Sequence, residues 1–79
     1  MSRGKHKQPK ALAEHVQSAF DRYVATLEGE EPRDLHTIFV GEAERALIEA
    51  VMAYTDNNQS RAARILGINR NTLRSKLGL

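Results

Sequence analysis

Polar and basic side chains gather near the end of the chain in a pattern that suits recognition of a nucleic acid. Within residues 70–76 the sequence places Arg70, Asn71, Thr72, Arg74 and Lys76. Arginine can donate two hydrogen bonds to guanine, asparagine can pair with adenine, and threonine can bond either a base or a phosphate. The pattern therefore predicts a short helix whose outward face contacts double-stranded DNA.

A helix-turn-helix is the element that would position these side chains. Asn58 is suited to cap a helix over 59–66, and Asn69 a second helix over 70–77, because asparagine at an N-cap accepts a backbone N–H. Gly67 is suited to a positive φ at the corner between them. Two short helices joined by such a turn form a helix-turn-helix, and the first turn of its second helix reaches base edges.

The two short helices also need a small residue where they touch and apolar anchors on both sides. Ala63, four residues before Gly67, supplies the small contact. The predicted local core consists of Leu66, Ile68 and Leu73, completed by Ala62, Ile65 and Leu77. Helical hairpins that bind nothing share this spacing of alanine and glycine, so the core alone does not decide the function.

Two longer helices are predicted upstream. The first has an apolar stripe at intervals of three and four residues, formed by Leu12, Val16, Ala19, Phe20, Tyr23, Val24 and Leu27. Pro9 suits its first turn and Gly29 its C-terminal cap. The second is predicted from Pro32 to Tyr54, about 34 Å long at 1.5 Å per residue, with Asp34 in its first turn. The predicted fold class is all-α, with four helices.

The second of these helices is longer and more apolar than a small monomer can cover. A chain of 79 residues without cysteine cannot use disulfides for stability, which favours association of two copies. We therefore predict a homodimer through the two N-terminal helices, with a two-fold contact around Phe39, Ala43, Ala46, Leu47, Ala50, Val51 and Tyr54. The alternative is that the short helices of the same chain cover both faces.

Composition excludes several other classes of protein. No cysteine is present, and His6, His15 and His36 lack a short metal-ligand spacing, so neither a metal nor another cofactor is expected. The absence of cysteine fits a reducing compartment such as the cytoplasm. No apolar run approaches the roughly 18 residues of a membrane span, and the basic N-terminus is followed by no apolar stretch of a signal peptide.

The net charge of +2 conceals an uneven layout. Residues 1–10 carry four basic and no acidic residues, residues 11–54 nine acidic and three basic, and residues 55–79 one acidic and five basic. Both ends are therefore suited to a polyanion, and the acidic middle to another role. We expect a basic, disordered tail over 1–10, a two-helix dimerisation region over 11–54 and a helix-turn-helix DNA-binding unit over 55–79.

The residues that carry these predictions resemble a known family. Residues 58–74, NQSRAARILGINRNTLR, resemble the C-terminal motif of the Fis (factor for inversion stimulation) family and of the related domains that end NtrC-type transcriptional activators. Residues 47–55, LIEAVMAYT, also resemble Fis, as do FDRYV at 20–24 and LEG at 27–29. The resemblance extends over roughly 11–79, which favours a complete Fis-like protein over the DNA-binding domain of an activator.

The resemblance implies a homodimeric bacterial protein that binds and bends DNA and acts in transcription regulation, nucleoid organisation or recombination. It implies that Asn69 and Arg70 contact bases at the start of the recognition helix. It further implies contacts with phosphates or flanking bases by Asn58, Ser60, Arg61, Thr72, Arg74 and Lys76. Contact with a recombinase or with RNA polymerase is left open.

The chain departs from the family pattern at three places. Ser75 stands where the family commonly has lysine, and the chain stops at Gly78-Leu79 where relatives often continue with basic residues, so weaker backbone contacts are expected. Residues 1–10 lack the alternating pattern of the hairpin arm that contacts invertases, so recombinase stimulation by that arm is not expected. The tail is expected either to touch flanking phosphates or to be only a solubilising segment.

Two other functions are alternatives to DNA binding. An enzyme is not expected, because His15 and His36 are more simply surface residues of helices and no glycine-rich phosphate loop is present. Glu42, Glu44 and Glu49 likewise resemble a solvated helix face. The stronger rival is an acidic helical dimer that binds a protein partner and whose C-terminal hairpin is only structural.

Overall fold

The chain is all-helical over residues 10–79, the part that the computed structural model describes. The described elements, in chain order, are α1 (Lys10–Thr26), the π-helix η2 (His36–Val40), α2 (Gly41–Tyr54), α3 (Gln59–Leu66) and α4 (Arg70–Lys76). The chain divides into two compact units, the first ending at Arg33 and the second beginning at Asp34. The predicted fold class of four α-helices is confirmed.

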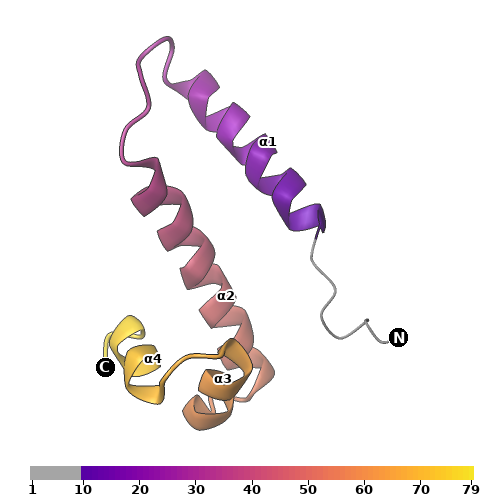
Figure 1. Cartoon of the computed structure of the whole chain (residues 1–79), viewed down its shortest axis with the longest axis vertical. Helices are drawn as coiled ribbons and strands as arrows, with labels where there is room; N and C mark the ends of the chain where they lie inside the picture. Colours follow the sequence, from indigo (N-terminus) through magenta and orange to yellow (C-terminus); the bar gives the residue numbers. More distant parts are fainter. Residues whose placement is uncertain (1–9) are drawn as a thin grey trace. The chain divides into compact units, whose positions relative to one another are not determined.

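Helix α1, drawn in indigo to purple in Figure 1, has a sequence with the predicted amphipathic pattern. Its stripe exposes Leu12, Val16 and Phe20 to solvent. The helix ends at Thr26, whose Oγ1 donates to the Tyr23 carbonyl at 2.6 Å, and Gly29 follows with a φ of 91°. The prediction for Pro9 and nearly all of the predicted tail over 1–10 lie outside the described residues, except that Lys10 begins α1.

The predicted start of the second long helix, at Pro32, is wrong. Asp34 has a φ of 54°, a left-handed value that a continuing right-handed helix does not allow, so Pro32 and Asp34 both precede the helix. The Asp34 carbonyl instead accepts the N–H of Ile38 at 3.0 Å. One wide turn, η2, then leads directly into α2; its residues are largely β-branched or aromatic, types with modest helix propensity.

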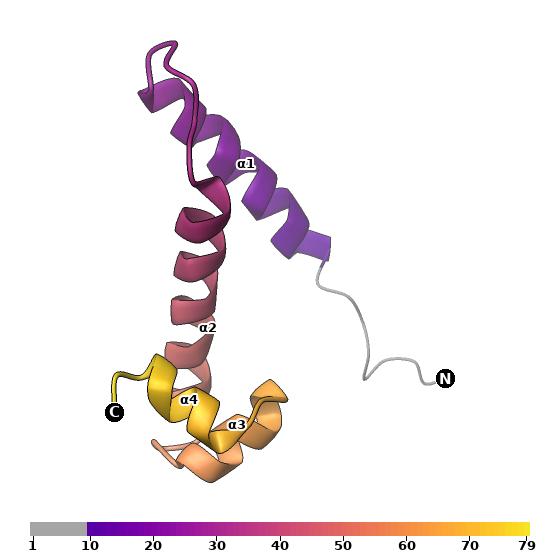
Figure 2. The ribbon, with the colours of Figure 1, turned by 60° about the vertical axis from the view of Figure 1, so that its left-hand side comes forward.

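The core of the second unit lies where α3 and α4 gather at the C-terminal end of α2 (Figures 1 and 2). All three helices contribute buried side chains, which are Ile48, Met52, Ala62, Ala63 and Leu73. Half-buried Val51, Leu66, Ile68 and Leu77 pack around them. The predicted contribution of Ile65 to this core is wrong, because Ile65 is 48% exposed. Helix α3 directs Ala62, Ala63 and Leu66 toward the core, and Ile65 lies on another side of the helix.

Helix α2 has two apolar faces. One face carries Ile48 and Met52 and is buried against α3 and α4. At about 100° per residue, the opposite face carries Ala43, Leu47, Ala50 and Tyr54, all of which are exposed. Charged Glu42, Arg45 and Glu49 separate the two faces on one side. The second apolar face is therefore not covered by α3 or α4.

Candidate nucleic-acid interface

The corner of the helix-turn-helix is made by Gly67, as the sequence predicts. Its φ is 77°, and its N–H donates to the carbonyls of Ala63 and Arg64 at 2.8 and 3.2 Å. The Ile68 N–H donates to the same Ala63 carbonyl at 3.0 Å. This is the Schellman arrangement, which satisfies the last carbonyls of α3 and directs the chain into α4. The predicted helix-turn-helix is confirmed.

Both predicted caps are also present. Asn58 Oδ1 accepts the backbone N–H of Arg61 at 3.0 Å, and Asn69 Oδ1 accepts that of Asn71 at 2.6 Å. Both asparagines have extended backbone angles, as an N-cap requires. The side-chain oxygens of Asn58 and Asn69 therefore bond the backbone of α3 and α4, and fix where each helix begins.

The predicted DNA-contacting side chains lie on the surface of this unit. Leu73 is fully buried and fixes which side of α4 faces the core. The remaining predicted residues of α4 are exposed, namely Arg70, Asn71, Thr72, Arg74 and Lys76. Asn58, Ser60 and Arg61 at the start of α3, and Asn69 before α4, are exposed as well. All nine predicted residues are thus accessible to solvent, on α3, on α4 and at the asparagine caps before them.

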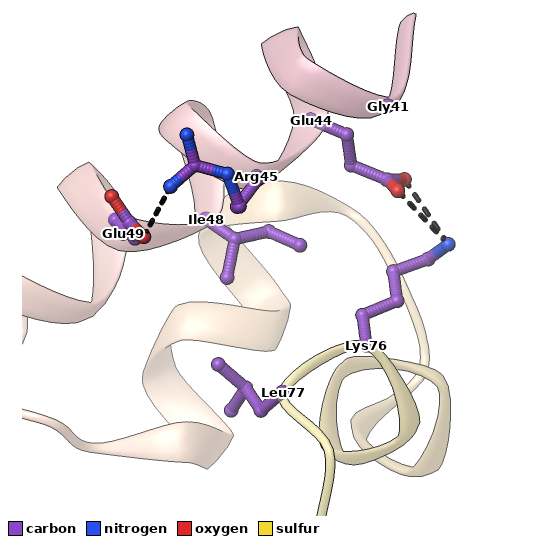
Figure 3. A pocket seen from close by; sticks show the side chains of 7 residues that line it. All are labelled: Gly41, Glu44, Arg45, Ile48, Glu49, Lys76 and Leu77. Carbon is purple, nitrogen blue, oxygen red and sulfur yellow. Dashed lines mark hydrogen bonds and ion pairs between the residues drawn. The ribbon is translucent and has the colours of Figure 1, made fainter. Parts of the chain in front are cut away.

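Three of these cations are held by partners that the sequence did not reveal. Arg74 Nη1 donates to Gln59 Oε1 of α3 at 3.3 Å. Lys76 Nζ lies 3.1 Å from Glu44 Oε2 of α2 (Figure 3). The guanidinium carbon of Arg61 lies 5.4 Å from the centroid of the Tyr54 ring, within the range of a cation–π contact. These contacts join residues of different helices, and no spacing rule within one helix finds them.

A second charged cluster lies along α2 itself. Arg45 pairs with Glu42 one turn before it and with Glu49 one turn after it, the latter at 2.8 Å. The hydrogen bond that Arg45 donates to Glu42, followed by the negative charges of both carboxylates, raises the pKa of Arg45 above its usual value. The two carboxylates therefore favour the charged form of Arg45, which offsets part of the negative charge on this side of α2.

Other kinds of site find no support in the part of the chain that the structure describes. Residues 10–79 contain no group of three or more histidine, aspartate or glutamate side chains placed to hold a metal ion. His15 and His36 are exposed. No helix in the same range is both long and apolar enough to cross a membrane.

Comparison with known proteins points to one family. Residues 39–78 match the family described as "Bacterial regulatory protein, Fis family", a range that runs from η2 to the end of α4. The DNA-binding protein Fis of Mannheimia haemolytica is 46% identical over 68 residues, which cover 86% of this chain and 69% of the relative. That of Actinobacillus succinogenes is 47% identical with the same coverage.

The DNA-binding protein Fis of Proteus vulgaris gives a similar result, with 46% identity over 86% of this chain and 73% of the relative. The similarity includes α1 as well as the helix-turn-helix, because 68 matched residues exceed the length of the second unit. With its helical fold, its glycine corner and its two asparagine caps, the chain belongs to the Fis family of bacterial regulatory proteins.

Proposed function

We propose that the chain is a homodimeric DNA-binding protein of the Fis type, which binds and bends duplex DNA through its helix-turn-helix. The observation that carries the proposal is the construction of α4. Buried Leu73 anchors its inner side, the Gly67 corner sets its start, and every other residue from Arg70 to Lys76 is exposed. Apart from Leu73, the side chains of α4 lie outside the core, and those of the proposed contacts are of the types that read bases and hold phosphates.

Individual roles follow from position along the two helices. Asn69 and Arg70, at the start of α4, are the proposed base contacts, with Asn71 beside them. Asn58, Ser60 and Arg61, at the start of α3, and Thr72, Arg74 and Lys76, along α4, are the proposed phosphate or flanking contacts. The basic charge of residues 55–79 supports this assignment, because phosphate neutralisation dominates the affinity of such proteins.

Dimerisation is proposed through residues 11–54. The exposed face of α2, with Ala43, Leu47, Ala50 and Tyr54, supports the proposal because its small residues allow a second helix to approach closely. Ala46 is exposed beside this face, and half-buried Phe39 and Val51 lie at its borders. Two copies of the basic unit on one dimer would contact two half-sites, and half-sites closer than a helical turn of about 34 Å would require bent DNA.

The proposed cellular setting is the cytoplasmic nucleoid, where such a protein would act in transcription regulation, chromosome organisation or recombination. The names of the relatives, DNA-binding protein Fis, support the DNA partner. The basic tail over 1–10 is proposed as an additional phosphate contact.

The test is a gel-shift titration of a duplex of mixed sequence with Arg70→Ala. We expect Arg70→Ala to weaken binding by about tenfold or more, since a good bidentate base contact contributes about 1–3 kcal/mol. Arg64→Ala is the matched control: Arg64 is an exposed arginine of α3 outside the proposed contacts, and its loss removes the same charge. If both variants weakened DNA binding equally, Arg70 would contribute only its positive charge, and the proposed base contact would be contradicted.

The rival function has a distinct signature in the same experiment. If the protein never shifts duplex DNA at low salt while remaining a folded dimer, the helix-turn-helix is only structural. The exposed face of α2 would then be the surface of a protein-interaction module.

A further inference from the structure

Lys76 does not extend freely from the end of α4 but is bound to a carboxylate of another helix. Its Nζ lies 3.2 Å from Glu44 Oε1 and 3.1 Å from Glu44 Oε2, so both oxygens of the carboxylate share one ammonium group. Figure 3 shows the two side chains extending toward each other from α2 and α4. Both remain partly exposed, at 36% and 47% of their side-chain surface. The ion pair is thus accessible to a competing anion.

Besides this ion pair, α4 is held by apolar burial, since Leu73 is fully buried and Leu77 packs against the same core. Ile48 of α2 and Leu77 at the end of α4 face each other beside the ion pair (Figure 3), and Ile48 is buried in the core. Burial of such side chains contributes far more to stability than a solvent-exposed ion pair does. The Glu44–Lys76 pair is therefore expected to contribute little to the position of α4, in comparison with the burial of Leu73.

The two cations at the end of α4 are held in chemically different ways. Arg74 and Lys76 are two residues apart, about 200° around the helix, so they flank the buried side on opposite edges. Gln59 is neutral, so its bond to Arg74 orients the guanidinium without opposing a nearby phosphate. Glu44 carries a negative charge, so a phosphate that approaches Lys76 must displace the carboxylate or lie next to it.

We propose that Glu44 restrains DNA binding by competing with a backbone phosphate for Lys76. The inference rests on the proposed function, because it takes Lys76 to be a phosphate contact. In the free protein the carboxylate holds the ammonium against α2. When the protein binds DNA, the Lys76 ammonium leaves Glu44 and pairs with a phosphate. Breaking the Glu44–Lys76 ion pair costs free energy, so the net gain in DNA affinity from the phosphate contact is smaller. Glu44 thereby sets both the strength and the salt sensitivity of binding.

The experiment measures dissociation constants for one fixed duplex across a salt series, with Glu44→Gln compared with Glu42→Gln. Both substitutions remove one negative charge from an exposed position of α2, but Glu42 pairs with Arg45 and not with Lys76. We expect Glu44→Gln to tighten binding by about two- to fivefold per chain relative to Glu42→Gln, the range that an exposed ion pair supports. The dependence of affinity on salt should become steeper as well.

A double-variant cycle isolates the pair. In a Lys76→Gln background, Glu44→Gln should give no more than the effect of Glu42→Gln, because the competing cation is gone. Glu44→Ala provides a second neutral variant that favours the helix, with folding checked by circular dichroism.

Three results would overturn the inference. Weaker binding by Glu44→Gln would mean that the carboxylate orients Lys76 for DNA. Equal effects of the two glutamine variants would mean that only net charge matters. An undiminished effect in the Lys76→Gln background would mean that Glu44 acts through another group. Failure of the unmodified protein to bind duplex DNA is a separate outcome, which contradicts the proposed function itself.

Discussion

Two glycines of the second unit serve opposite purposes. Gly67 occupies the left-handed region with a φ of 77°, whereas Gly41 is helical, with φ and ψ of −61° and −45°. A Cβ at either position would meet no atom within 4 Å. Backbone conformation, and not crowding, therefore decides what a substitution by alanine does at each site.

We predict that Gly67→Ala destabilises the fold and Gly41→Ala stabilises it. Alanine in the left-handed region costs about 1–2 kcal/mol, and alanine in place of a helical glycine gains about 0.5–1 kcal/mol. Urea unfolding followed by circular dichroism would measure both. A loss at both positions would mean that Gly41 has a role beyond its helix.

The sequence predicted the local features at this scale and missed the long-range ones. Asn58, Asn69 and Gly67 act on backbone groups within a few residues, so their types and spacing were sufficient. The partners of Lys76 and Arg74 lie 32 and 15 residues away in the chain. Such contacts depend on how helices pack, and no pattern in one segment specifies them.

At the scale of elements, α2 is the helix with two apolar faces. Its inner face completes the core with α3 and α4, and its outer face exposes Leu47 by 56% and Tyr54 by 69%. The sequence predicted the apolar excess but not how it divides between the two faces. The helix start predicted from the sequence was also too early. The residue types of Pro32-Arg33-Asp34 do not indicate that Asp34 adopts a left-handed conformation, which keeps these residues out of the helix.

We predict that Leu47→Lys prevents dimerisation, because it would place a charge at the centre of the outer face. Glu49→Lys is the matched control, since it puts the same side chain two residues away on the charged side of α2. Sedimentation at micromolar concentration should give a dimer for the unmodified protein and the control, and a smaller species for Leu47→Lys. A Leu47→Lys variant that remains dimeric would contradict the proposed interface.

At the scale of the whole molecule, charge is divided between the acidic region proposed for association and the basic region proposed for DNA binding. Residues 11–54 carry a net negative charge and residues 55–79 a net positive one. The net charge of +2 gives no sign of this division, yet a polyanion would meet chiefly the basic part. The division of charge along the chain could be predicted from the sequence, whereas the positions of the charged side chains on the surface could be found only from the structure.

We predict a steep loss of DNA affinity with salt. If both copies of Arg61, Arg74 and Lys76 contact phosphates, the slope of the logarithm of the DNA association constant against the logarithm of salt concentration should be about −5. If Lys76 stays paired with Glu44 and contacts no phosphate, the slope should be about −4. A salt series of gel shifts or anisotropy titrations would measure the slope. A flat response would contradict phosphate binding by these residues.

The contact between Tyr54 and Arg61 has an optical consequence. The chain has no tryptophan and two tyrosines, so tyrosine dominates its intrinsic fluorescence. The Tyr54 ring lies on the outer face of α2 and also beneath a cation of the proposed DNA surface. With Tyr23 replaced by phenylalanine, a single tyrosine would lie next to both the proposed dimer interface and the proposed DNA surface, and its fluorescence could follow both proposed events without an attached dye.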